Sequence, residues 1–339
     1  MSEPPLEYVC GPVKPEDILA LPGTPWLITS GFAPGAGLKL VNARTGAFRT
    51  WFSGDAGQIG SPLNDAPACS HPVDPALFNA RGLSLRRTGA NRWRLLVVNH
   101  GGRESIEMFD ISTRRDKEPE LTWRGCLPMP TGQVGNSVTS FADGTVLVTV
   151  LTRPGTVIAD FVEGRDTGAV WSWSPGATTF VELLGTRLPG NNGIEADPDG
   201  SRFYVVAFGW HSVVVFNRRD TSQPLSRIEA PGFMPDNIHW TGDRLLLTGM
   251  ALDEPACGGV RKVVNGVADP MLCHRSWAVG ELDRRTGRIT VRASGKAASA
   301  FNGHSSAAIA AGRLWLGSFQ SSRLASLPLP LTLSRGKRR

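Results

Sequence analysis

Side chains that could bind a metal recur at one position of a repeated pattern in this sequence. Each copy of the pattern is a short apolar-alternating segment, a turn rich in Gly, Asp, Asn or Pro, and a second apolar segment. At the start of the first segment stand Glu16, Arg81, Asn136, Asn192, Asp236 with Asn237, and His304. Carboxylates and amides without thiolates are the donors that hard cations such as calcium prefer. The set therefore predicts a site for a divalent cation.

The clearest copy of the pattern shows which elements must position these residues. Asn192 opens a strand, the turn Asp197-Pro198-Asp199-Gly200 has the residues of a hairpin, and residues 202–208 form a second, buried strand. The pattern occurs six times, at starts roughly 45 to 70 residues apart, and amphipathic helices are scarce. This predicts an all-β fold, a six-bladed β-propeller with a central metal site.

The propeller explains why distant residues would meet. The first strand of each blade lines the central channel, so the residues that open these strands face one another. Glu16 and Asp236 would balance the charge of one divalent ion, and the amides of Asn136, Asn192 and Asn237 would complete its ligands. Any one of these residues alone would be interpreted as a turn or strand-start residue. Their recurrence at one position favours the metal site.

Composition and chain ends limit the other possibilities. The formal charge is +6 and no segment approaches the length of an apolar membrane span. The first residues lack the order of a secretory signal, and the five cysteines lack metal-site spacing. We expect a cytoplasmic protein with free thiols, no nucleic-acid partner and no membrane span, although Cys257 and Cys273 could pair across one loop. Residues 1–330 should form a single domain and residues 331–339 a basic, disordered tail.

Three connections are longer than the others, at residues 55–78, 151–168 and 252–276. Loops of this length inside a compact domain are usually functional. We expect all three to cover one face of the propeller.

At these residues the sequence resembles the paraoxonase family, calcium-dependent lactonases and arylesterases within the wider group of gluconolactonase (SMP-30-like) and strictosidine-synthase-like propellers. The matching segments are PEDILALPGTPWLITSG from Pro15, FNARGLSL from Phe78, LLVVNHGGRESIEMFDI from Leu95, GNSVTS from Gly135, NNGIEADPDGSRFYVV from Asn191, PDNI from Pro235 and GHSSAAIAAGRLWLGSF from Gly303. The resemblance implies that Glu16, Asn136, Asn192, Asp236 and Asn237 hold a catalytic calcium. It also implies that His100 belongs to a histidine pair that supplies a general base.

Three departures from the family pattern change these expectations. Arg81 stands where the family has a histidine next to the metal, so a relay of two histidines cannot operate unchanged. Ser137 stands where an aspartate would join Asp17 in holding a second, structural calcium, which argues against that ion. Ser326 replaces the cysteine that would link the last strand to the N-terminus.

The expected reaction is hydrolysis of a small lactone or ester, anionic or aromatic, with calcium (or manganese or magnesium) polarising the carbonyl. The general base would be His100, His304 or a metal-bound carboxylate of Asp236 or Glu16. Arg81 is permanently charged, and it would stabilise the oxyanion, bind a substrate carboxylate, or pair with Glu16 or Asp236. Two other classes stay open: a non-hydrolytic lyase, isomerase or condensing enzyme on the same metal propeller, and a binding propeller with structural calcium.

Overall fold

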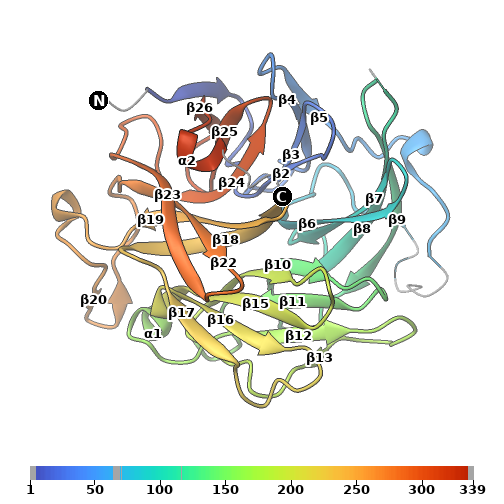
Figure 1. Ribbon diagram of the computed structural model, residues 1–339. Coiled ribbons are helices and arrows are strands. Elements are labelled where there is room, and N and C mark those ends of the chain that lie inside the picture. Colours follow the sequence, from blue (N-terminus) through green and yellow to red (C-terminus); the bar gives the residue numbers. More distant parts are fainter. Residues whose placement is uncertain (1–4, 64–68, 70, 116, 335–339) are drawn as a thin grey trace.

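The structure, a computed structural model, describes residues 5–63, 69, 71–115 and 117–334. Six four-stranded antiparallel sheets surround a central axis (Figure 1). The predicted six-bladed propeller is confirmed. The blades are β2 (Ile18–Ala20), β3 (Trp26–Thr29), β4 (Lys39–Asn42) and β5 (Phe48–Thr50); β6 (Ala80–Gly89), β7 (Arg92–Asn99), β8 (Ser105–Ser112) and β9 (Glu120–Pro128); β10 (Gly135–Ser140), β11 (Val146–Val150), β12 (Ala169–Trp173) and β13 (Val181–Glu182); β14 (Asn191–Ala196), β15 (Arg202–Ala207), β16 (Ser212–Asn217) and β17 (Ser226–Glu229); β18 (Phe233–Thr241), β19 (Arg244–Ala251), β22 (Trp277–Asp283) and β23 (Arg288–Gly295); and β24 (His304–Ala310), β25 (Arg313–Ser318), β26 (Arg323–Pro328) and β1 (Glu7–Cys10).

The sixth blade takes its outer strand from the start of the chain. β1 pairs antiparallel with β26, and Glu7 lies opposite Ser326. Backbone hydrogen bonds therefore close the ring where the sequence lacks the expected cysteine. Cys10, at the other end of β1, is an exposed free thiol.

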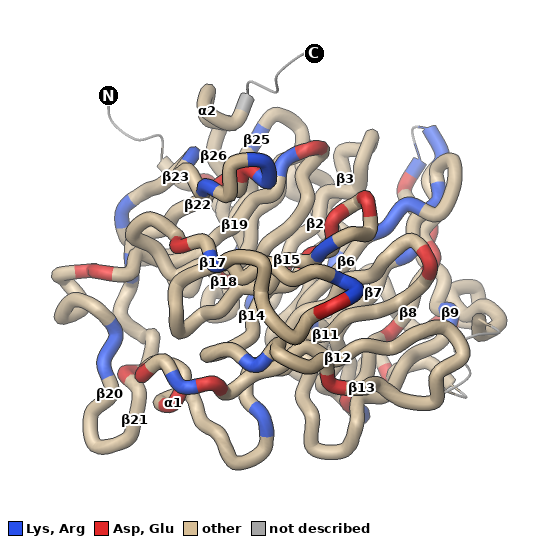
Figure 2. Tube along the Cα trace, turned by 60° about the horizontal axis from the view of Figure 1, so that its bottom comes forward, with Lys and Arg blue, Asp and Glu red and all other residues tan. Residues whose placement is uncertain are grey.

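The core lies between neighbouring blades. Alternate side chains of a strand point to opposite faces of its sheet, so each inner sheet must bury both faces. In β15, Phe203 and Val205 pack toward the third blade, whereas Tyr204 and Val206 pack toward the fifth. This double burial explains why residues 202–208 have an almost uninterrupted apolar sequence. Charged residues of both signs are instead spread through the turns and loops (Figure 2).

Two of the three long connections pack together on the face from which the inner strands start, which we call the lid face. Residues 151–168 contain α1 (Ile158–Val162). Residues 252–276 contain η3 (Pro255–Cys257) and the hairpin β20 (Val263–Val264) and β21 (Val267–Ala268), and α1 contacts β21. A shorter turn, η2 (Phe208–Trp210), follows β15 on the same face.

The first long connection differs from the expectation that it covers the same face as the other two. It contains η1 (Ala56–Gln58), and after this turn it runs along the outer strand β9, where the Gly60 N–H donates to the Trp123 carbonyl at 3.0 Å. Cys69 then forms a disulfide with Cys126 of β9. Residues 64–68 and 70 lie outside the described residues. The described part therefore covers the edge of the second blade.

The expectation of free thiols is wrong for four of the five cysteines. Cys69 pairs with Cys126, and Cys257 pairs with Cys273 across the lid-face loop. Only the second pair was considered from the sequence, where the two cysteines lie in one loop. Cys69 and Cys126 are 57 residues apart and are brought together by the fold. Disulfides persist in oxidising compartments, so the cysteines no longer support the predicted cytoplasmic location.

The last described residues form α2 (Leu331–Ser334), whose Leu333 is buried against the fifth and sixth blades. The folded body thus extends past residue 330, and residues 335–339 of the expected tail lie outside the described residues. No helix in the described part of the chain has the length and apolar character needed to cross a membrane.

Candidate metal and active site

A β-bulge marks the predicted site position in five inner strands. The pairing register shifts between Ala80 and Leu83 in β6, and at the corresponding place in the other four. These other shifts fall between Gly135 and Val138, Asn191 and Ile194, Pro235 and Asn237, and His304 and Ala307. A bulge adds an unpaired residue and redirects its side chain. Arg81, Asn136, Asn192 and Asp236 all lie within these bulges.

Glycines next to the site residues let neighbouring inner strands approach. A Cβ on Gly193 would lie 2.6 Å from the carbonyl oxygen of Asp236 and 2.9 Å from Cα of Asn237. A Cβ on Gly82 would lie 2.6 Å from the carbonyl oxygen of Asn136. Only a residue without a side chain fits these positions, so the second blade lies against the third and the fourth against the fifth at the level of the site.

Glu16, Asn192, Asp236 and Asn237 lie together in a buried group of oxygens, and Asn136 occupies the equivalent bulge of β10; we call these five residues the ring. Nδ2 of Asn237 donates to Oε1 of Glu16 at 3.2 Å, and the Asn192 side chain donates to the carboxylate of Asp236. Burial, with the charge of Asp17, raises the pKa of Glu16 to about 7. Burial, with the charge of Glu16, raises the pKa of Asp236 well above its ordinary value. Two carboxylates thus share a desolvated site in which burial and neighbouring negative charge raise the pKa of both.

Four oxygens of this ring are buried and have no hydrogen-bond partner among the described residues. They are Glu16 Oε2, Asn136 Oδ1, Asn192 Oδ1 and Asn237 Oδ1. Buried polar atoms are nearly always satisfied, so these four acceptors leave room in their chemistry for a cation. Carboxylate and amide oxygens suit calcium. Within the described part of the chain, no three His, Cys, Asp or Glu side chains lie close enough together to bind a metal ion. Binding of a metal at this ring would therefore need the asparagine oxygens as ligands.

The structure places His304 outside this ring. The prediction that His304 occupies the site position of the sixth blade is therefore wrong. His304 pairs with Ser318, and the equivalent residues are Ala80 and Asn191, one position before the site residues. Ser305 therefore occupies the ring position, and its Oγ and that of Ser306 donate to the carbonyl of Glu16 at 2.5 and 2.9 Å. The offset of one residue could not be predicted, because residues 303–306 contain no local signal for the strand register.

His304 itself is fully buried beside aromatic rings. Its ring centroid lies 4.8 Å from that of Phe301 and 6.0 Å from that of Trp277. Burial, with a smaller contribution from His274, lowers the pKa of His304 to about 3. Neither ring nitrogen has a hydrogen-bond partner among the described residues. A histidine this hard to protonate is a weak base.

A second layer lies one to three residues further along the inner strands. Oδ1 of Asp17 lies 2.7 Å from Nε2 of His239, and Oδ2 of Asp17 accepts from the Leu83 N–H at 2.8 Å. The Ser137 hydroxyl accepts from the Ile194 N–H at 3.4 Å. Because Asp17 is satisfied by the protein and Ser137 is neutral, these residues do not fit a second divalent ion. His239 is not among the site residues predicted from the sequence, so this pairing was missed.

Arg81 and His100 lie at the side of the ring. The Arg81 guanidinium is 3.2 Å from the centroid of the Phe32 ring, and its Nε and Nη1 are buried without a hydrogen-bond partner among the described residues. Burial lowers the pKa of Arg81, while Glu16 and Glu104 act to raise it. Nδ1 of His100 lies 3.1 Å from Oε2 of Glu104. Glu104 was missed from the sequence, although its spacing of four residues from His100 within one turn was a usable signal.

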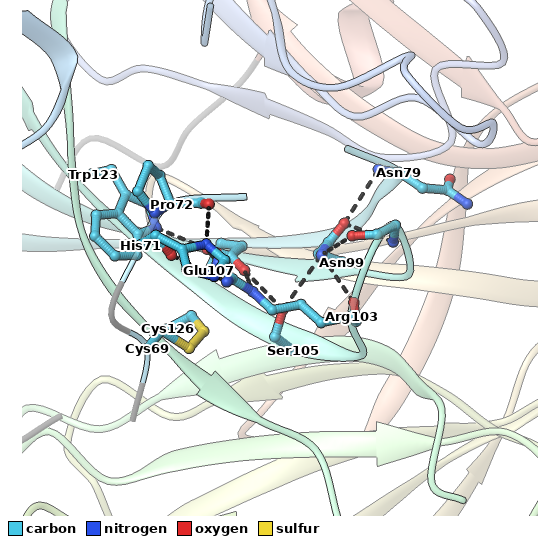
Figure 3. A network of polar contacts seen from close by, with 11 residues as sticks. Cys69, His71, Pro72, Asn79, Asn99, Arg103, Ser105, Glu107, Trp123 and Cys126 are labelled. Atoms are coloured by element: carbon cyan, nitrogen blue, oxygen red, sulfur yellow. Dashed lines mark hydrogen bonds and ion pairs between the residues drawn. A yellow bond between two sulfur atoms is a disulfide. The ribbon is translucent and has the colours of Figure 1, made fainter. Parts of the chain in front are cut away.

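A polar network holds the turn that carries His100 and Glu104 (Figure 3). Asn99 accepts from the N–H groups of Asn79 and Gly101 and donates to the carbonyls of Gly101 and Arg103, all between 2.9 and 3.2 Å. The network therefore fixes both ends of the turn.

The fully buried Glu107 anchors the same network from β8. Its carboxylate accepts from Arg103 at 2.9 and 3.0 Å, from Ser105 at 2.8 Å and from Trp123 at 2.7 Å. Arg103 also donates to the carbonyl of His71, which joins the turn to the segment that carries the Cys69–Cys126 disulfide (Figure 3). All acceptors of Glu107 are used, so its role is structural support of the turn.

Apolar side chains from the lid face pack near the ring. Phe161 of α1, Phe208, Met234 and Met250 form a buried cluster, against which Leu252 and Met271 of the second lid-face loop and Phe319 also pack. Met234 is two residues from Asp236 in β18. The two lid-face loops thus supply an apolar cover for the site.

Comparison with known proteins agrees with this architecture. Similar solved structures include a luciferin-regenerating enzyme, 10% identical over 96% of both chains with a TM-score of 0.53. They also include the calcium-binding protein regucalcin from Agrobacterium tumefaciens, 12% identical over 95% of this chain and 92% of that chain with a TM-score of 0.53. The chain has the fold of these propellers. A Bacteroides thetaiotaomicron protein of unknown function is also similar, 10% identical over 95% of this chain and 75% of that chain with a TM-score of 0.54.

At this level of identity the similarity extends to the fold alone. No protein-family model matches the sequence, and none of the curated proteins matches it. The comparisons thus support the propeller fold, and the resemblance to the SMP-30 and gluconolactonase group, and to paraoxonases in particular, stays a prediction.

Proposed function

We propose that this protein is a calcium-dependent hydrolase of small lactones or esters. The observation that carries the proposal is the set of four buried oxygens of the ring that have no hydrogen-bond partner among the described residues. Glu16, Asn136, Asn192, Asp236 and Asn237 would hold the ion. Calcium fits this set better than magnesium, because calcium accepts many neutral oxygens whereas magnesium keeps much of its water shell. Bound there, calcium would polarise the substrate carbonyl and favour attack by water.

The chain's own residues divide the remaining tasks. His100 is the general base that we favour, because the carboxylate of Glu104 contacts Nδ1 and fixes the orientation of the ring. His304 is the weaker candidate, because burial lowers its pKa to about 3 and so makes it a weak base. The apolar cover of Phe161, Phe208 and Met250 would exclude water from the reacting centre.

Arg81 would select the substrate. A permanent charge with two buried nitrogens that no described residue pairs with suits a bidentate contact with a carboxylate on the substrate. Phe32 against the guanidinium holds its plane in place. We therefore expect anionic lactones or esters to be preferred over neutral ones.

The test is a panel of neutral and carboxylate-bearing lactones and aryl esters, assayed with calcium, manganese, magnesium or chelator. Hydrolysis should require a divalent ion, and Asp236→Asn should weaken calcium binding at least about 100-fold. The matched control Asp199→Asn changes an exposed turn residue and should bind calcium normally.

Arg81→His should lower the ratio of anionic to neutral substrate turnover, and an unchanged ratio removes the selectivity role of Arg81.

One observation favours a second candidate. Arg81 replaces the histidine implied by the resemblance, so a non-hydrolytic lyase, isomerase or condensing reaction on the same metal site is the alternative. Calcium binding without turnover of any lactone or ester would favour that alternative or a binding propeller in which calcium is structural.

A further inference from the structure

A large cavity opens on the face opposite the lids, where the turns between first and second strands lie; we call this the hairpin face. Its volume is about 1420 Å³, and all six blades contribute to its lining. It reaches inward to Glu195 and His239, the layer next to the oxygen ring. Concave, mostly preformed cavities of this kind are where small ligands bind.

The carboxylates in this lining already have partners. Asp197 pairs with Arg202 at 3.2 Å and with Arg284 at 2.5 Å. Glu195 accepts from Thr139 at 2.9 Å, and its Oε2 lies 3.7 Å from His239. Glu118 pairs with Arg49. These acids therefore leave little negative charge to balance other groups in the cavity.

Three arginines of the lining lack such partners. Arg44, Arg86 and Arg87 form no ion pair within 4 Å with any described residue, and all three come from the first and second blades. Arg86 is half-buried, and its Nε makes a single 3.3 Å contact with the hydroxyl of Ser140. Asp143, the acid whose charge acts on Arg86, forms its ion pair with Arg218 instead.

The environment of Arg86 opposes its charge. Burial lowers the pKa of Arg86 and the neighbouring charge of Arg94 lowers it further, while the charge of Asp143 acts to raise it. A half-buried guanidinium of this kind gains from an anion that accepts its hydrogen bonds. Arg87 and Arg44 are exposed at the rim, where they would attract an anion and contact a second charged group.

We propose that the hairpin-face cavity binds a small molecule with two or more anionic groups, with Arg86 as the inner contact and Arg87 and Arg44 at the rim. The shared chemistry is a phosphate or carboxylate group. The site is separate from the metal centre, because the layer of Asp17, Glu195 and His239 lies between them.

The proposal is tested by titrating the full-length protein, as purified, with inorganic phosphate and with succinate in a calorimeter at constant ionic strength. We expect saturable binding of at least one of them, and the stronger one identifies the phosphate or carboxylate class. Arg86→Gln should weaken binding at least tenfold, Arg86→Lys less, and Arg87→Gln to an intermediate extent.

The control is Arg285→Gln, which removes an exposed arginine outside this lining. Absence of saturable binding by the wild type, or equal weakening in Arg86→Gln and Arg285→Gln, overturns the proposal. Unfolding curves of each variant identify any that fail to fold. If Arg86→Gln does not fold, weaker binding by Arg87→Gln at the exposed rim tests the proposal instead. Asp236→Asn should bind the anion normally, so this result is independent of the proposed hydrolysis.

Discussion

Nε2 of His239 lies 2.7 Å from Oδ1 of Asp17, while Nδ1 of the same ring lies 3.7 Å from Oε2 of Glu195. Three inner strands, from the fifth, first and fourth blades, thus meet at one imidazole. Burial acts to lower the pKa of His239, but the charge and hydrogen bond of Asp17, with those of Glu195, raise it to about 10. A protonated histidine therefore balances the buried carboxylate of Asp17 and the half-buried carboxylate of Glu195.

Replacing His239 should destabilise the protein strongly. His239→Gln leaves the buried charge of Asp17 without a cation, which typically costs about 3–5 kcal/mol. Urea unfolding of the single variants and of Asp17→Asn/His239→Gln measures the coupling. The double variant should lose less than the sum of the single losses, by roughly 0.5–3 kcal/mol. Strict additivity would show that the pair does not interact.

Acid should destabilise the protein through His304. Its folded pKa of about 3 lies below the ordinary value of 6.5, so the unfolded state binds the proton first. The stabilising contribution is complete above pH 6.5 and is lost as the pH falls toward 3, with a slope approaching about 1.4 kcal/mol per pH unit. Denaturant unfolding from pH 7 to pH 4 should show a shallower decline for His304→Phe. His71→Gln, an exposed control, should follow the wild type.

Glu107 should be needed for the stability of the second blade. Glu107→Gln removes the charge that pairs with Arg103 and disturbs the contacts of Ser105 and Trp123, at a cost of about 3 kcal/mol. The control Glu229→Gln changes a side chain that is 81% exposed and should alter stability by less than about 0.5 kcal/mol. Equal effects on the free energy of unfolding would contradict the anchoring role of Glu107.

Gly193→Ala should disturb the oxygen ring without touching a ligand. The added methyl would meet the backbone of Asp236 and Asn237, which cannot move aside as a flexible side chain can. We expect weaker calcium binding and lower stability, by about 1–3 kcal/mol for such overpacking. Gly57→Ala is the matched control, since nothing lies within 4 Å of its Cβ and its backbone is not in the left-handed region. Normal calcium binding by Gly193→Ala would show that the strands can separate there.

The two disulfides should stabilise the chain unequally. Cys69 and Cys126 enclose 57 residues, whereas Cys257 and Cys273 enclose 16. The chain-entropy model gives about 4 kcal/mol for the longer loop and about 3 kcal/mol for the shorter. Chemical unfolding of Cys69→Ser and Cys257→Ser measures both losses. Cys10→Ser, which removes the exposed free thiol, should have no effect. A larger loss for Cys257→Ser would rule out loop length as the dominant cause.

The blades could be predicted because their signals are local. A strand that buries both faces must be apolar at almost every position, as in residues 202–208, and the turn residues between such strands are found in the sequence. The oxygen donors of the site were also predictable, because Glu16, Asn192 and Asp236 open equivalent strands. Their types follow directly from the sequence, and so does the kind of cation that they suit.

The tertiary structure alone decided which side chains meet. Asp17 and His239 are 222 residues apart, and their contact depends on closure of the ring rather than on any local preference. The bulge in β24 places Ser305 instead of His304 at the axis, because pairing with β25 sets the register and a shift of one residue redirects every side chain. The pairing of Cys69 with Cys126 depends likewise on a loop that packs along β9. Long-range closure and strand register are cooperative properties of the whole fold, so no single segment of the sequence encodes them.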